Sequence, residues 1–90
     1  MTKRQLIKTI HENTELRYVD VEEVVNKVFE TITDAICEDE KVTINGFGTF
    51  EKVEQSAYIG VNPHTGEKMQ VNAFNKIRFT TGKSLKNKIN

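Results

Sequence analysis

The side chains with most potential for chemistry are cations, and they gather in the second half of the chain. Residues 46–90 hold seven basic and three acidic side chains, a net charge of +4, whereas residues 1–45 hold six basic and ten acidic ones, a net charge of −4. Affinity for phosphate comes mostly from lysine and arginine, so the zero net charge of the whole chain argues against binding of nucleic acid. The uneven distribution of charge between the two halves does not argue against it. In a plainer interpretation, which stays open, the charges only solubilise a helix face and an exposed ribbon.

Residue sets for catalysis or metal binding do not emerge from the pattern. No nucleophile has a paired base, no two carboxylates share a face, and no Gly-rich phosphate loop precedes a helix. Gly46-Phe47-Gly48 lies between two expected strands, and His11 has no second His or Cys at metal-ligand spacing. We therefore expect a protein that is not an enzyme and needs no cofactor or metal.

A polar ribbon with a sharp turn occupies the middle of the chain. Residues 60–66 contain an Asn-Pro pair and a closing glycine, which is strong turn chemistry. Apolar residues are too sparse between Glu51 and Gly60 for a strand pair packed on a core, and an isolated two-stranded ribbon is marginal in water. The ribbon must therefore have a partner. Its shape fits a DNA groove, with Pro63 either a wedge between base steps or an ordinary turn former.

Two amphipathic helices are predicted ahead of the ribbon. The first follows a capping box of Thr2 and Gln5. The second has the clearest periodicity, because seven apolar residues share one face of a 3.6-residue repeat and predict a helix packed on a core. They are Val21, Val24, Val25, Val28, Phe29, Ile32 and Ile36. This helix starts either at a second capping box of Asp20 and Glu23 or one turn earlier, near Arg17.

Alternating residues predict two strands before the ribbon. Lys41–Ile44 forms the first, and a two-residue turn at Asn45-Gly46 leads to the second, Phe47–Val53. We expect these two strands to pair as a hairpin.

A third strand and a short helix follow the ribbon. Lys76–Thr80 alternates, with Ile77 and Phe79 on the core side and the basic residues facing solvent or phosphate. Thr81 is expected to cap the last helix. The predicted fold is therefore α+β, in the order helix, helix, strand, strand, ribbon, strand, helix.

The size of the chain indicates an oligomer. With 90 residues it makes one small domain, of a size that is marginal as a monomer. Cys37 is the only cysteine, so no disulfide framework can form, and a reducing intracellular setting fits best. We expect the Cys37 side chain to be small and buried or half-buried at the end of the apolar stripe. We expect no signal peptide and no membrane span, since no apolar run is long enough.

Together these pieces resemble the bacterial HU/IHF family of histone-like DNA-binding proteins, with this chain an unusually acidic member. The resemblance covers the whole chain and rests on three segments at family spacing: Gly46–Phe50, Asn62–Glu67 and Phe79–Lys86. It implies one domain over residues 1–90, with a helical dimerisation part at about 1–40 and a sheet, β-arm and C-terminal helix at about 41–90. The implied assembly is an intertwined homodimer with three-stranded antiparallel sheets, whose long protruding β-ribbon arms wrap double-stranded DNA through its minor groove.

The resemblance also implies residues for each role. Pro63 would be the wedge that unstacks a base step, and backbone amides near Gly46-Phe47-Gly48 could hold a phosphate. The implied DNA-binding residues are Lys3, Gly46, Phe47, Gly48, Lys52, Gln55, Tyr58, Val61, Asn62, Pro63, His64, Thr65, Lys68, Gln70, Lys76, Arg78, Lys83, Ser84 and Lys86. The implied dimer core is Val25, Val28, Phe29, Ile32, Ile44, Phe47, Phe50 and Phe79.

The ascending arm departs from the family pattern at positions that usually carry arginine or lysine. These positions hold Val53, Gln55, Tyr58, Ile59 and Val61. Each missing cation removes roughly one phosphate contact, so we expect a lower non-specific affinity and a flatter salt dependence. The apolar residues could instead contact sugars in the minor groove, bind another protein, or pack the arm against itself. Asn72 and Thr81 stand where proline is common, which leaves the stiffness of the arm's hinges open.

The expected function is that of a homodimeric architectural protein that binds and bends DNA largely without sequence specificity and compacts the nucleoid in the cytoplasm. The alternative is an HU-like dimer with weakened DNA affinity, acting as a protein-interaction or assembly module or as heterodimer partner of a homologous subunit. The residues leave open any preference for DNA sequence or structure, and a chromosomal, plasmid or viral origin.

Overall fold

Helix α1 (Lys3–Glu12) starts at the predicted capping box. The Thr2 hydroxyl accepts a hydrogen bond from the Gln5 amide at 3.2 Å, and Gln5 Oε1 accepts one from the Thr2 amide at 2.8 Å.

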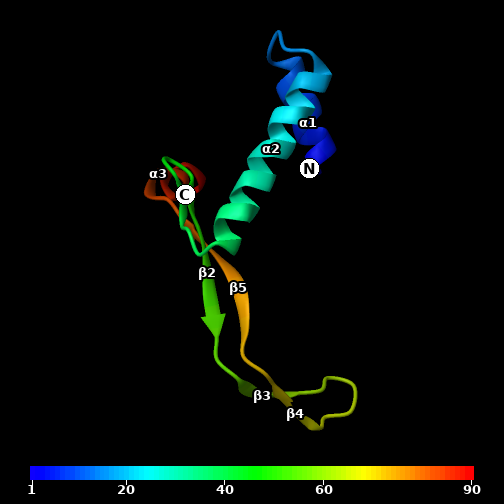
Figure 1. The fold of residues 1–90 in the computed structure, drawn as a ribbon, viewed down its shortest axis with the longest axis vertical. Helices are drawn as coiled ribbons and strands as arrows, with labels where there is room; N and C mark the ends of the chain where they lie inside the picture. The colour runs from blue at the N-terminus through cyan, green and yellow to red at the C-terminus, as the bar shows by residue number, and fades with distance from the viewer. The chain divides into compact units, whose positions relative to one another are not determined.

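The computed structural model describes residues 1–90 (Figure 1). These residues form two compact units, Met1–Asp34 and Ala35–Asn90. None of the helices combines the length and apolar character needed to cross a membrane.

Helix α2 (Tyr18–Cys37) begins at the earlier of the two predicted positions. The capping box of Asp20 and Glu23 was the wrong alternative, because the Asp20 carboxylate accepts hydrogen bonds from Arg17 Nε at 2.9 Å and Nη2 at 3.2 Å. The Val21 amide donates to the Arg17 carbonyl at 3.1 Å, which closes the first helical turn before Asp20 could act as a cap.

The core of the first unit is small. Ile7, Val21 and Val25 are buried, and Ile10 packs against them. Other members of the α2 stripe are not buried within the chain: Val24 is 61% exposed, Val28 46% and Phe29 47%. The prediction of a stripe packed on a core therefore holds for only part of it, because one short helix cannot cover the whole face of α2.

The end of α2 corrects the prediction for Cys37. Its side chain is exposed rather than buried, since it lies one residue, about 100° around the helix, beyond the buried Ile36. Asp39 then takes the left-handed conformation, with φ 63°, and the amide of Glu40 donates to the carbonyl of Ala35 at 2.9 Å. This is a Schellman-type helix end with aspartate at the position where glycine is usual.

The second unit contains a three-stranded antiparallel sheet. Its strands are β1 (Val42–Ile44), β2 (Gly48–Gln55) and β5 (Phe74–Thr81), in the order β1-β2-β5. The turn between β1 and β2 has three residues rather than the predicted two, because Ile44 pairs with Gly48 and the Phe47 amide donates to the Ile44 carbonyl at 3.0 Å. Phe47 thus lies in the turn and not in the strand.

A second, two-stranded sheet is formed by the ribbon, β3 (Tyr58–Val61) and β4 (Lys68–Val71). Short segments join β3 to β2 and β4 to β5, as Figure 1 shows. The chain ends in α3 (Lys83–Ile89), whose N-cap is Gly82 without a side-chain hydrogen bond. The predicted cap, Thr81, is wrong because this residue is the last of β5 and pairs with Gly48.

Candidate nucleic-acid interface

The register of the sheet separates its side chains into two faces. Residues directly opposite each other on paired strands point to the same face. Phe50 pairs with Phe79, so these two share one face, whereas Glu51 pairs with Arg78 on the other. We call the first the aromatic face, formed by Val42, Ile44, Phe50, Lys52, Glu54, Asn75, Ile77, Phe79 and Thr81. We call the second the polar face, formed by Lys41, Thr43, Thr49, Glu51, Val53, Gln55, Phe74, Lys76, Arg78 and Thr80.

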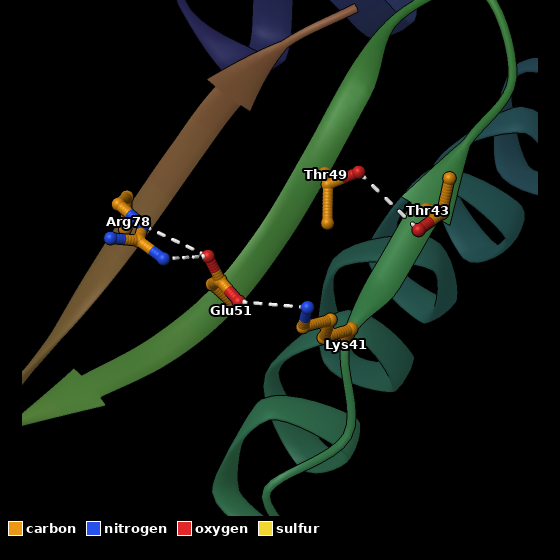
Figure 2. A network of polar contacts seen from close by, with 5 residues as sticks. All are labelled: Lys41, Thr43, Thr49, Glu51 and Arg78. Atoms are coloured by element: carbon orange, nitrogen blue, oxygen red, sulfur yellow. Dashed lines mark hydrogen bonds and ion pairs between the residues drawn. The ribbon is translucent and has the colours of Figure 1, made fainter.

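A carboxylate between two cations organises the polar face. Glu51 Oε1 accepts a hydrogen bond from Arg78 Nε at 2.8 Å and also contacts Arg78 Nη2, and Lys41 Nζ lies 3.5 Å from Oε2 (Figure 2). The Glu51 side chain is 14% exposed, but those of Lys41 and Arg78 are 71% and 60% exposed. The hydrogen bond from Arg78 lowers the pKa of Glu51 below its usual value of about 4.5, aided by the charge of Lys41.

Hydrogen bonds hold the other polar side chains of this face. The hydroxyls of Thr43 and Thr49 lie 3.3 Å apart across β1 and β2, as Figure 2 shows. Lys76 Nζ donates to Gln55 Oε1 at 3.0 Å. Thr80, opposite Thr49, lies on the same face. The face therefore presents three exposed cations, three threonine hydroxyls and one amide, which are groups that can bind phosphate oxygens.

The structure brings together some of the predicted DNA-binding residues of the sheet and separates one of them. Lys76 and Arg78 share the polar face, whereas Lys52 lies on the aromatic face, where its Nζ is 2.7 Å from Asp39 Oδ1. Lys41 joins the polar face although sequence reasoning did not include it. The signal was available, because Lys41 lies two residues before Thr43 and strand side chains alternate.

Three phenylalanines form the centre of the aromatic face and the adjoining turn. Ring centroids are 4.8 Å apart for Phe50 and Phe79 and 5.5 Å apart for Phe47 and Phe79. Phe47 is 44% exposed and Phe79 39% exposed, so the cluster is not covered within one chain. The Phe47 amide is already bonded in the turn and its carbonyl accepts from the Gly82 amide at 2.8 Å. The Phe47 amide is therefore not free to hold a phosphate.

The tip of the ribbon is a tightly hydrogen-bonded turn. The Asn62 amide donates to the Glu67 carbonyl at 2.8 Å, and the Gly66 amide to the Asn62 carbonyl at 2.7 Å. Asn62 Oδ1 accepts from the His64 amide at 2.9 Å, an Asx turn around Pro63. Pro63 and His64 are exposed at this tip, so the turn holds a rigid apolar ring in solvent.

The two strands of the ribbon expose apolar side chains. Ile59 is 71% exposed, Val61 62% and Met69 49%. The register places Ile59 and Val61 on one face with Gln70 and Lys68, and Tyr58 on the other face with Val71 and Met69. The predicted residues Val61, Lys68 and Gln70 thus share a face of mixed apolar and polar character.

The remaining predicted cations lie on helices. Lys3 belongs to the first unit, where it lines a small hollow with Arg4, Tyr18 and Asn26. Lys83 and Lys86 lie on α3 with Ser84, and all three are exposed. No cluster of His, Cys, Asp or Glu is suited to hold a metal ion.

Comparisons with known proteins place this arrangement in a family. The family described as bacterial DNA-binding protein matches residues 1–90. The chain belongs to this family. It is 43% identical over 90 residues to DNA-binding protein HU-1 of Halalkalibacterium halodurans, covering 100% of both chains. It is 34% identical to integration host factor subunit alpha of an Anaeromyxobacter species, covering 100% of this chain and 91% of the other.

The fold of this HU/IHF family member also matches solved structures. A chain of an Anabaena HU–DNA cocrystal structure has a TM-score of 0.90 at 35% identity, covering 99% of this chain and 97% of that one. The expected α+β fold, with three helices and antiparallel sheets, is therefore confirmed, as is the resemblance to the HU/IHF family. The family is one of DNA-binding proteins rather than of enzymes.

Proposed function

We propose that this chain is an HU-type architectural DNA-binding protein. The observation that carries the proposal is the near-complete match of its fold to an HU chain crystallised with DNA. The polar face, with Lys41, Lys76 and Arg78, and the exposed helix cations Lys83 and Lys86 supply the positive charge that such binding needs. Contacts of this kind go to the backbone, so they position DNA without reading its sequence. A place in the nucleoid follows from that function.

The functional unit is proposed to be a homodimer. One chain leaves Val28, Phe29, Phe47 and Phe79 between 39% and 47% exposed, which is a large apolar surface for a 90-residue chain. A second copy that covers these side chains would add the core that a small domain lacks. Ile32, Ile44 and Phe50 belong to the same proposed interface.

The ribbon is proposed to be an arm that follows the minor groove, with Pro63 as its wedge. Support comes from the exposed tip, where the Asx turn at Asn62 fixes the proline ring without packing it against the chain. Inserting an apolar ring between base steps costs a few kcal/mol of stacking, which the contacts made by bent DNA offset. The DNA would run along the arm past the remaining proposed contact residues, which are Gln55, Tyr58, Val61, Thr65, Lys68 and Gln70.

The test is fluorescence anisotropy with intact, nicked and gapped duplexes across a salt series. We expect saturable binding, a linear fall of log K with log salt, and tighter binding to the nicked and gapped duplexes because they bend at lower cost. Pro63→Ala should reduce the bend measured by energy transfer between the duplex ends while leaving the salt slope unchanged. A folded dimer that binds none of these duplexes even at low salt would overturn the proposal.

A second candidate function is favoured by the exposed apolar residues Ile59 and Val61. These apolar side chains would suit a protein partner better than phosphate, making the dimer an interaction or assembly module. A mixed dimer with a more basic homologous subunit is a version of this idea. Substitution of Val61 by arginine separates the two functions.

A further inference from the structure

Glu51 is the only acidic side chain on the polar face, and it lies between that face's cations. Its carboxylate accepts from Arg78 Nε at 2.8 Å and lies 3.5 Å from Lys41 Nζ. In Figure 2 Arg78 reaches toward it from β5, and Lys41 from the position just before β1. A phosphate arriving at this face would offer the same chemistry as the carboxylate, oxygen atoms with negative charge that accept hydrogen bonds from guanidinium and ammonium groups.

We propose that Glu51 is an internal competitor for phosphate that limits how strongly the polar face binds DNA. The inference rests on the proposed DNA-binding function and deepens it by naming what sets affinity. The carboxylate reduces the charge of the face from three cations to a net of two, and it occupies the Nε–H of Arg78 together with one terminal amino group. A DNA phosphate must therefore share or displace this partner before Arg78 contributes fully.

Burial makes the carboxylate a durable competitor. The Glu51 side chain is 14% exposed, so it lies beneath cations that are 60% and 71% exposed. Because solvent screens such a carboxylate less than an exposed one, its attraction for Arg78 and its repulsion of an approaching phosphate persist at moderate salt. Lys76, whose partner is the neutral Gln55, has no such restriction.

Glu54 provides a matched control on the same strand. It pairs with Asn75, so its side chain lies on the side of the sheet opposite Glu51, and it makes no ion pair. E51Q and E54Q each add one positive charge per chain by removing one carboxylate from β2. Any difference between the two variants therefore reports the position of the carboxylate and not net charge.

The experiment measures affinity for an intact duplex across a salt series for wild type, E51Q, E54Q, R78Q and E51Q/R78Q. We expect E51Q to bind about three- to tenfold tighter at low salt, with a slope of log K against log salt steeper by about 2 for a dimer, one further phosphate per chain. E54Q should change both quantities less. R78Q should weaken binding less in wild type than in E51Q and remove the gain of E51Q, a strong non-additivity.

Outcomes separate this inference from the proposed function. Wild-type binding with E51Q no tighter than E54Q, in variants shown by thermal unfolding to be folded, overturns the inference and leaves the function standing. A purely structural role of Glu51 would give that same result, with lower stability and no gain in affinity. Absence of DNA binding by folded wild type and E51Q alike overturns both. A gain in affinity with an unchanged salt slope also contradicts the inference, since no further phosphate is then bound.

Discussion

At the scale of single residues, close packing and neighbouring charges limit which side chains a position tolerates. Gly48 lies so close to the aromatic cluster that an added Cβ would be 2.5 Å from Phe79 Cζ and 2.6 Å from the Thr80 carbonyl oxygen. Contacts this short require the ring and the backbone of β5 to move. The glycine is therefore needed for its size, because it lets β2 pass directly under the Phe79 ring.

Gly48→Ala is expected to destabilise the fold by about 1–3 kcal/mol, the usual cost of forcing a methyl group into a packed site. Chemical denaturation of the purified variant measures this. Gly60→Ala is the control, because its Cβ would meet Tyr58 and Val71 at 3.6 Å, an ordinary contact distance. Equal loss of stability in the two variants would contradict the packing argument.

The ion pair of Glu51 with Arg78 predicts a pH dependence. The pKa of Glu51 is lowered in the folded chain by the hydrogen bond from Arg78, below the usual value of about 4.5. A lowered pKa means that the pair stabilises the fold above about pH 4.5 and that this contribution is lost as pH falls through the folded value. The advantage of wild type over E51Q should therefore shrink on acidification below about pH 4.5. Denaturant midpoints at a series of pH values measure it, and a constant difference would refute this account.

At the scale of elements, the ribbon and the three-stranded sheet differ in what stabilises them. The sheet gains its order from β2, which pairs with β1 on one edge and β5 on the other. The ribbon pairs only with itself, through four residue pairs, and exposes Ile59 and Val61. An isolated ribbon of this kind is marginal in water. Its stability and its function therefore both depend on what it contacts outside the chain.

Val61→Arg is expected to distinguish the two candidate partners of the ribbon. If the ribbon follows the minor groove, an added cation in each arm should tighten DNA binding and steepen the salt slope by about 2 for a dimer. Val61→Glu at the same position should weaken binding, which controls for loss of the valine. If the ribbon binds a protein partner, the arginine should leave the affinity for DNA unchanged and weaken association with that partner instead. Anisotropy measures the first quantity and sedimentation the second.

At the scale of the whole molecule, the chain exposes apolar surface in both of its units. Val24, Val28 and Phe29 remain exposed in the first, and Phe47 and Phe79 in the second. Charge is also divided, with an acidic first half and a basic second half. A small domain that leaves this much apolar surface in water has a strong driving force for self-association, at about 25 cal/mol per Å² of apolar area removed from water.

Phe29→Asp is expected to shift the homodimer toward monomer, because burying an unpaired carboxylate in an apolar interface is costly. Sedimentation equilibrium measures the shift, and the melting temperature of wild type should rise with protein concentration. Glu23→Lys is the control, since it changes charge on the side of α2 opposite the apolar stripe. A monomeric wild-type protein, or an unchanged dimer in the Phe29 variant, would contradict the proposed interface.

The amino-acid sequence by itself determined the local features of this protein. The Thr2 and Gln5 cap, the period of α2 and the turn at residues 62–66 each depend on neighbours a few residues apart, so the pattern contains the needed information. The three family segments likewise predicted the overall fold. Whether Asp20 or Arg17 opened α2 stayed ambiguous, because both positions carry residues that satisfy local rules.

The tertiary structure alone decided which side chains meet. Lys52 and Arg78 look equivalent in sequence, but the register of β2 with β5 places them on opposite faces, and shifting it by one residue would bring them to the same face. Glu51 finds Arg78 at a separation of 27 residues, and the third residue of the β1–β2 turn follows from the pairing of Ile44 with Gly48. Register is set by hydrogen bonds and packing summed over whole strands, which no local pattern contains.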